Sequence, residues 1–232
     1  MNNLYIVATP IGNLQDITLR ALETLKEVDV IACEDTRHTQ IILTKFDIHN
    51  KRLIACHAKN EMASSQGIIK LLEEGQSVAY VSDAGTPGIS DPGNRLVREV
   101  RKAGFTVIPI PGVSAMATLV SVSGTADKAF TFEGFLSPKA GKRKSKITDL
   151  LDQENAFILY ESPYRIEKLL HELEELCPDK MLTIGREMTK AFEQFITGTP
   201  TQCIEQLKVF KGEFCVLVSN APKTKRDSDD NT

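Results

Sequence analysis

The sequence predicts an α/β protein of two domains, and two observations carry this prediction. Short β-rich runs alternate with amphipathic segments through the first 110 residues, which is typical of βαβ units around a mostly parallel sheet. A break at Pro111–Gly112 and a second series of runs indicate another α/β domain with a mixed sheet. We expect domains over residues 1–112 and 113–220, with a cofactor cleft between them, and a disordered tail over 221–232.

The individual elements follow from periodicity and turn residues. The first helix is expected over 18–26, because Thr18 can cap it and Leu19, Leu22 and Leu25 then share one face. The last two strands are separated by only one short helix, so we expect an antiparallel arrangement there. Strands are predicted over 5–9, 28–33, 52–56, 77–82, 106–110, 131–135, 156–160, 181–186, 194–198 and 213–219, and later helices over 114–123, 142–152, 165–177 and 201–209.

Composition excludes several classes of protein. No apolar run approaches the roughly 18 residues of a membrane span, and the N-terminus enters a strand without a basic leader, so we expect a cytoplasmic protein. The formal charge of −3 argues against general coating of nucleic acid but permits a local basic patch. We expect no metal site, and we expect the five widely spaced cysteines to be reduced core residues: Cys33, Cys56, Cys177, Cys203 and Cys215.

The most informative segment is 82–93, SDAGTPGISDPG, which lies between the apolar run 78–81 and a helical pattern starting at Asn94. Its glycines permit positive φ and close backbone approach, while its prolines stiffen the chain. Loops at the carboxyl ends of parallel strands collect ligands, so we predict a small-molecule site made mainly of main chain. A tight strand-to-helix turn is the alternative interpretation. Dinucleotide and Walker motifs are absent.

Two charged sets are candidates for catalysis. Glu34, Asp35 and Arg37 follow the apolar run 28–33, at the carboxyl end of a predicted strand, where a general base could act. The alternative for this set is acids that favour the start of a helix. Glu187 and Lys190 follow the strand 181–186, and the alternative for this pair is ordinary surface ion pairing. The sequence does not choose the base among them.

A basic run at 139–146 holds five cations and no acid. It could form a flexible clamp for phosphates, which position RNA without reading its sequence. The alternative is a solvated helix start. The candidate RNA-binding residues of this run are Lys139, Lys142, Arg143 and Lys144.

Several strings together resemble one known class of enzymes: ATPIGNLQDIT at 8–18, ACEDTRHT at 32–39, SDAGTPGISDPG at 82–93, PGVSA at 111–115, ESPYR at 161–165 and GREMTKAFEQ at 185–194. The set resembles the tetrapyrrole-methylase-like class of S-adenosylmethionine-dependent methyltransferases over about residues 4–219, and within it the 16S ribosomal RNA cytidine 2′-O-methyltransferases. The resemblance implies S-adenosylmethionine as cofactor, a cytidine ribose of 16S rRNA in the small ribosomal subunit as substrate, and a homodimer.

The resemblance also implies where the cofactor binds, and the alternative for the turn 111–115 is a domain connector with a serine cap, which is compatible with cofactor binding. The candidate lining residues are Pro10, Gly85, Ile89, Asp91, Pro111, Gly112, Val113, Ser114 and Tyr160. Val113 stands where the family often has proline, Lys59 replaces a frequent histidine, and the chain stops about where many relatives continue. A tetrapyrrole-precursor methylase and a non-catalytic module that binds S-adenosylmethionine remain as alternatives.

Overall fold

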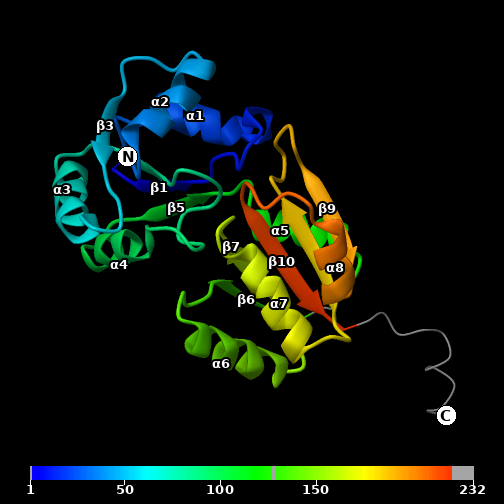
Figure 1. Cartoon of the computed structure of the whole chain (residues 1–232). Coiled ribbons are helices and arrows are strands. Elements are labelled where there is room, and N and C mark those ends of the chain that lie inside the picture. Colours follow the sequence, from blue (N-terminus) through cyan, green and yellow to red (C-terminus); the bar gives the residue numbers. More distant parts are fainter. Residues whose placement is uncertain (1, 127–128, 221–232) are drawn as a thin grey trace, which may run out of the picture. The chain divides into compact units, whose positions relative to one another are not determined.

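The computed structural model describes residues 2–126 and 129–220, so the predicted tail at 221–232 lies outside the described residues. The chain divides into two compact units, Met1–Ser114 and Ala115 onward, and each unit is built on a five-stranded sheet (Figure 1). In the part that the structure describes, no helix is long and apolar enough to cross a membrane.

The sequence predicts a mostly parallel sheet in the first unit, and the observed sheet is parallel throughout, with the order β3-β2-β4-β1-β5. Helices connect successive strands and cover both faces of the sheet (Figure 1). The elements are β1 (Leu4–Val7), a 3₁₀ turn η1 (Leu14–Asp16), α1 (Leu19–Glu27), β2 (Val30–Cys33), α2 (Thr36–Lys45), β3 (Arg52–Ala55), α3 (Glu61–Glu73), β4 (Val78–Val81), α4 (Asn94–Lys102) and β5 (Val107–Ile110).

The central strand β4 explains why this region is so apolar. All four of its residues are buried, because a parallel strand covered on both faces has no polar side. Val78 and Tyr80 pack toward α3 and α4, whereas Ala79 and Val81 pack toward α1 and α2. The parallel direction brings every strand's carboxyl end to one edge of the sheet. The loops 8–13, 34–35, 56–60, 82–93 and 111–114 therefore begin at that edge.

The second unit contains the predicted mixed sheet, with the order β6-β7-β10-β8-β9. Only β6 and β7 are parallel neighbours; the other pairs are antiparallel. The elements are α5 (Ala115–Ser123), β6 (Phe130–Phe135), α6 (Ala140–Leu151), β7 (Ala156–Glu161), α7 (Ile166–Leu176), β8 (Met181–Arg186), β9 (Gln194–Gly198), α8 (Pro200–Gln206) and β10 (Phe214–Ser219).

The expectation for the last two strands needs a correction. The strands β9 and β10 are not neighbours, because β8 lies between them and pairs antiparallel with both. They therefore run in the same direction. The physical reason is that β8 and β9 form a hairpin through 187–193, and α8 then carries the chain back across the sheet to start β10 on the other side of β8.

All five cysteines are buried and free of disulfides, as predicted. Burial raises the pKa of the Cys56 thiol to about 11 and that of Cys215 to about 12. A thiol must be deprotonated to act as a nucleophile. These side chains therefore serve as small apolar core residues at neutral pH.

Candidate active site

Three loops of the first unit are tied together at the carboxyl edge of β4, β1 and β5. The backbones of Thr9 and Gly85 exchange two hydrogen bonds, of 2.9 and 3.0 Å. The Thr86 hydroxyl donates to the Val113 carbonyl oxygen at 2.9 Å. The structure thus brings together the predicted cofactor segments around Pro10, Gly85 and Val113, which lie far apart in the sequence. We call these joined segments, 8–11, 82–93 and 111–113, the cradle.

Two glycines make this close approach possible. Gly85 has a φ of +76°, and a Cβ atom there would lie 3.3 Å from Ile11 Cγ2 and 3.6 Å from the Val113 carbonyl oxygen. At Gly112 a Cβ would lie only 2.9 Å from Ala8 Cβ. Glycine is required at both positions, for backbone conformation at Gly85 and for space at Gly112.

A residue outside the predicted site fixes the far end of the glycine-rich loop. Glu61 begins α3, and its Oε1 accepts hydrogen bonds from the backbone N–H groups of Gly93, Arg95 and Leu96 at 3.0 to 3.1 Å. Helix α4 has no side-chain cap of its own, so Glu61 satisfies its first free N–H groups from another helix. No local pattern in the sequence could have coupled Glu61 to α4. Ile89 and Asp91 lie within the loop that is held in this way.

A cluster of acids lies where β2 and β4 end. The Asp35 N–H donates to Asp83 Oδ1 at 3.0 Å, and the Glu34 carboxylate accepts from the Asp83 N–H. Burial, followed by the negative charge of Asp83, raises the pKa of Glu34, while that hydrogen bond and the nearby His57 oppose the rise. Asp83 is not among the site residues predicted from the sequence, because its contact with Glu34 depends on β2 and β4 being neighbours.

Asp35 and Arg37 form a tight local pair at the start of α2. Asp35 caps the helix through a hydrogen bond from the Arg37 N–H to Oδ1, and the Arg37 guanidinium donates to Oδ2 at 2.6 Å. The hydrogen bonds from the Arg37 side chain and backbone hold the pKa of Asp35 well below its usual range. Asp35 is therefore a poor proton acceptor, and the structure favours the helix-start interpretation for it. Of the three predicted residues, Glu34 has the character of a base.

The second charged set, Glu187 and Lys190, ties the loop after β8 to Glu213, the residue that precedes β10. Lys190 Nζ donates to Glu187 Oε1 at 2.9 Å and to Glu213 Oε2 at 3.0 Å, and the Glu213 N–H also donates to Glu187. Burial is the largest single influence on Glu187 and raises its pKa, but the hydrogen bonds and neighbouring cations together outweigh it and lower that pKa. An ionised pair held in this way is poorly suited to proton transfer. The structure therefore favours the ion-pair interpretation over a catalytic one.

Comparison with known proteins decides the family. The model of the Tetrapyrrole (Corrin/Porphyrin) Methylases matches residues 3–203, which include the cradle and the acid cluster. The chain belongs to the tetrapyrrole methylase family. Relatives of this family member include two proteins named ribosomal RNA small subunit methyltransferase I. The protein from Borrelia garinii is 48% identical, and the alignment covers 94% of this chain and 99% of that protein. The protein from Synechocystis is 46% identical, and the alignment covers 98% of this chain and 82% of that protein.

Several solved structures have a similar fold. A diphthine synthase superposes with a TM-score of 0.73 over 93% of this chain and 89% of its own, at 14% identity. The methyltransferase CobJ superposes with a TM-score of 0.70 over 94% of each chain, at 17% identity. Both confirm the predicted arrangement of one parallel and one mixed sheet.

The cofactor of the family, S-adenosylmethionine, fits the chemistry of the cradle. It carries a cationic sulfonium, an amino-acid group and a nucleoside, and such ligands are held by main-chain groups and a few placed polar side chains. The cradle offers both: peptide groups around Gly85 in a space that a Cβ would narrow, and the half-buried carboxyl side chain of Asp91. Among the described ranges 2–126 and 129–220, no group of three or more His, Cys, Asp or Glu side chains is placed to hold a metal ion.

Two further candidates for cofactor binding lie at the start of α5. Ser114 directly precedes the helix. Tyr160, on β7, accepts a hydrogen bond through its hydroxyl from the Met116 N–H at 3.1 Å, and its ring packs edge-on against Phe132 and Phe135. Tyr160 thus accepts a hydrogen bond from one of the backbone N–H groups that are left without helical partners at the start of α5.

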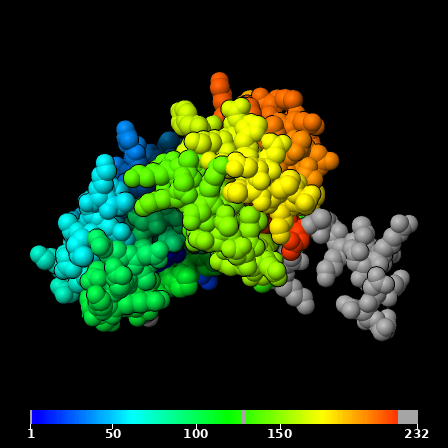
Figure 2. Space-filling model, turned by 60° about the horizontal axis from the view of Figure 1, so that its bottom comes forward, coloured from blue at the N-terminus to red at the C-terminus, as the bar shows by residue number. Residues whose placement is uncertain are grey.

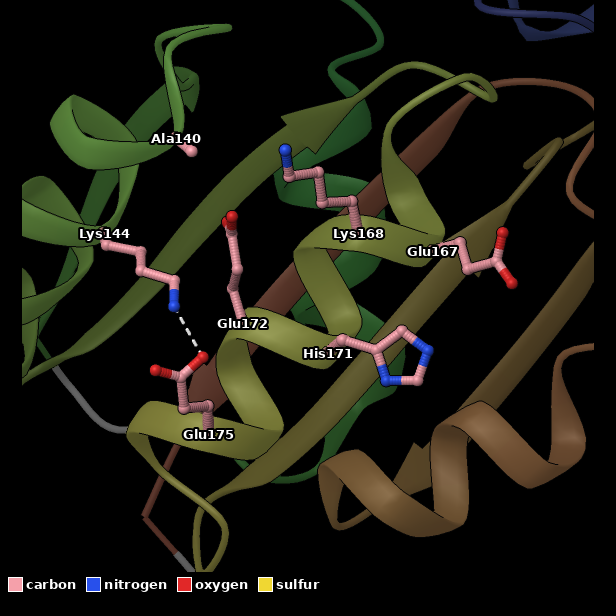
Figure 3. A pocket seen from close by; sticks show the side chains of 7 residues that line it. All are labelled: Ala140, Lys144, Glu167, Lys168, His171, Glu172 and Glu175. Atoms are coloured by element: carbon pink, nitrogen blue, oxygen red, sulfur yellow. Dashed lines mark hydrogen bonds and ion pairs between the residues drawn. The ribbon is translucent and has the colours of Figure 1, made fainter.

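The basic run at 139–146 is not a flexible clamp, because most of it forms the first turns of α6. The side chain of Arg143 is only 2% exposed and donates two hydrogen bonds to Glu172 on α7, at 2.5 and 2.6 Å. Its inclusion among the RNA-binding residues was therefore wrong: a buried bidentate pair leaves no face for phosphate. Lys144 pairs with Glu175 beside a shallow groove of mixed charge between the two helices (Figure 3). Lys139 and Lys142 remain exposed.

Replacing Arg143 by Met is expected to destabilise the protein by about 3 to 5 kcal/mol, because Glu172 would be left buried without its partner. Unfolding in urea measures the change. The double replacement Arg143→Met with Glu172→Leu should recover much of this loss, and Lys142→Met on the exposed face of the same helix should change stability by less than about 0.5 kcal/mol. A single variant as stable as the wild type would show that the pair does not support the fold.

The carboxyl edge of the second sheet carries exposed aromatic rings. The strands β6, β7 and β8 run in one direction, so their carboxyl ends share an edge. Phe135 ends β6, Tyr164 follows β7 with 95% of its surface exposed, and Phe192 follows β8 with 76% exposed. Large exposed rings of this kind stack with unpaired bases in proteins that bind single-stranded RNA.

Proposed function

We propose that this protein methylates the 2′-hydroxyl of a cytidine ribose in 16S rRNA of the small ribosomal subunit, with S-adenosylmethionine as methyl donor. The observation that carries the proposal is the similarity, at 39 to 48% identity over most of the chain, to proteins named ribosomal RNA small subunit methyltransferase I. The exposed rings at the edge of the second sheet and the exposed cations Lys139 and Lys142 are consistent with an RNA substrate.

The cradle would hold the cofactor, and the acid cluster at the ends of β2 and β4 would bind the ribose and accept the proton of its 2′-hydroxyl. S-adenosylmethionine supplies a methyl group on a positively charged sulfur. The chain's own contribution would be to orient the ribose 2′-hydroxyl toward the bound methyl donor and to accept the proton that the hydroxyl loses when it is methylated. Both sets of residues begin at the same edge of the first sheet, and the loop after β4 belongs to both.

We propose that Glu34 is the general base that accepts the proton of the ribose 2′-hydroxyl. Its raised pKa makes it a stronger base than an ordinary glutamate, and the backbone of Asp83 holds its carboxylate in place. Asp35 and Arg37 would support it by fixing the start of α2 next to Glu34. Ile89, Asp91 and the turn 111–114 remain in the proposal as cofactor-lining residues.

The remaining features of the proposal concern assembly and location. We infer a homodimer from the resemblance to the family, and a cytoplasmic location because the small ribosomal subunit is found there. The fold alone would also suit a tetrapyrrole-precursor methylase, since a uroporphyrin-III-C-methyltransferase superposes with a TM-score of 0.65 at 18% identity. The much higher identity to the rRNA enzymes favours RNA over a tetrapyrrole.

A transfer assay with labelled methyl groups tests the proposal. Small ribosomal subunits that lack ribose methylation are the substrate, and fully modified subunits and a porphyrinogen precursor are the controls. We expect label in the unmodified subunits alone. Label in the porphyrinogen would support the tetrapyrrole alternative, and cofactor binding without transfer to any substrate would indicate a non-catalytic module.

A further inference from the structure

Helix α4 carries a stripe of cations that the proposed site does not use. Arg95, Arg98, Arg101 and Lys102 are all exposed. Arg95, Arg98 and Arg101 follow one another at intervals of three residues, and Lys102 lies four residues after Arg98, which places all four along one side of the helix. Leu96 and Val100 on the other side are fully buried in the core. We call these four residues the α4 stripe.

The α4 stripe carries an excess of positive charge, because the helix holds four cations and one acid, while the carboxylate of Glu61 lies at its start. The one acid of the helix, Glu99, is only 18% exposed, and it lies 3.6 Å from Arg98 and 3.2 Å from Lys102. The stripe contains four of the twelve lysine and arginine residues of 1–114, within eight positions, although acids outnumber cations in that part of the sequence. The positive charge is therefore a local feature of α4 and not a property of the whole unit.

The surface of the stripe is open and concave. Asn94, Val97, Arg98, Arg101 and Lys102 line a shallow groove of about 540 Å³. In the space-filling view, the green surface of α4 lies uncovered next to the cyan surface of α3 (Figure 2). An extended anionic chain could lie along this groove.

The start of α4 links the stripe to the proposed active site. The helix begins at Asn94, directly after the cradle loop 82–93, and Glu61 anchors this junction. With a rise of 1.5 Å per residue, the stripe extends about 10 Å from Arg95 to Lys102, away from the edge that carries Glu34. A chain that places one ribose at that edge could continue along α4.

We propose that the α4 stripe binds backbone phosphates of the substrate RNA next to the methylated nucleotide. This inference rests on the proposed function, because it names the second contact surface for the same substrate. Arginine and lysine side chains neutralise phosphates and fix the position of an RNA without reading its sequence. A membrane surface is a poorer match, because helices that lie on membranes expose an apolar face, whereas Leu96 and Val100 are buried.

The test compares two triple variants of the full-length protein. Arg95, Arg98 and Arg101 are each replaced by Gln in one variant; in the control, Lys26, Lys45 and Lys70, exposed on α1, α2 and α3, are each replaced by Gln. Affinity for unmodified small subunits is measured from 50 to 200 mM salt. The stripe variant should bind at least tenfold more weakly, and the slope of log affinity against log salt should fall by about two, since each lost contact removes about 0.7. The control should match the wild type, and both variants should bind S-adenosylmethionine normally.

The outcomes separate this inference from the proposed function. If the wild type methylates small subunits and the stripe variant keeps the salt slope of the control, the stripe does not bind RNA and only this inference fails. If the wild type neither binds nor methylates small subunits, the proposed function fails and the stripe proposal fails with it. If the stripe variant instead loses binding to vesicles of anionic lipid while RNA binding is unchanged, the surface serves a membrane, which also overturns the inference.

Discussion

Replacing Glu34 by Gln is expected to lower the rate of methyl transfer by about 10²- to 10⁴-fold, the usual contribution of a general base. A ribose hydroxyl is a weak acid, so the reaction depends on a carboxylate that can take its proton. Glutamine keeps the shape of the side chain and can still accept a hydrogen bond from the Asp83 N–H. Single-turnover rates on unmodified small subunits measure the effect, and calorimetry should show unchanged binding of S-adenosylmethionine.

Asp35→Asn is the matched control for Glu34→Gln. Asparagine caps a helix about as well as aspartate, so α2 should start as before, and the loss of the Asp35 charge should change the rate far less than the loss of Glu34. Equal losses in the two variants would indicate a general effect of negative charge at this edge. A wild-type rate of methyl transfer in Glu34→Gln would show that Glu34 is not the general base.

The raised pKa of Glu34 gives this prediction a pH dependence. The rate requires ionised Glu34, so it should fall as the pH drops through a pKa that lies above that of an ordinary glutamate, and Glu34→Gln should lack this acidic limb. The same shift lowers stability above that pH, because the folded state binds the proton more tightly than the unfolded state does. Glu34→Gln should therefore be at least as stable as the wild type at neutral pH, and urea unfolding checks that its slower rate is not a folding defect.

Replacing Gly85 by Val is expected to weaken the binding of S-adenosylmethionine by at least about 100-fold. A side chain at this position would meet Ile11 and Val113 and would fill space in the cradle, and a β-branched residue strongly disfavours the positive φ. The loss of a well-shaped contact surface of this size corresponds to roughly 3 kcal/mol. Calorimetry with S-adenosylmethionine measures the change directly.

Gly75→Val is the control that separates the strain of a positive φ from the loss of space in the cradle. Gly75, after α3, has a φ of +85°, but a Cβ there would meet nothing within 4 Å. Both valine variants should lose similar stability, of order 1 to 3 kcal/mol for a residue forced into this conformation, but only Gly85→Val should lose the cofactor. Normal cofactor binding by Gly85→Val would reduce the loop 82–93 to a structural turn.

The sequence was sufficient to predict the strands, because β-rich runs and helical periodicity are local signals. The strand 181–186 was placed at its observed bounds, and Thr18 was correctly placed at the start of α1. The glycine-rich loop could be recognised for the same reason: glycine and proline restrict or release the backbone wherever they stand. Its partners across the cradle could be grouped only through the resemblance to a family.

The features that the sequence could not supply all depend on contacts between distant residues. Arg143 looked like one cation among five, and only the packing of α6 on α7 brings Glu172 against it. Glu34 meets Asp83 only because β2 and β4 are neighbours in the sheet. Glu61 can cap α4 only because α3 lies beside α4. Asp35 and Arg37 lie only two residues apart in the sequence, yet the direction of the carboxylate toward the helix start decides that Asp35 is a cap and not a base.

Nucleoside analysis of the methylated RNA tests the central claim most directly. Unmodified small subunits are incubated with the protein and labelled S-adenosylmethionine, and the 16S rRNA is then digested to nucleosides. We predict that the label is found in 2′-O-methylcytidine and that Glu34→Gln yields almost none of it in the same time. Label on a cytosine base, on another nucleoside or on no RNA at all would contradict the assignment of a ribose hydroxyl as the acceptor at the edge that carries Glu34.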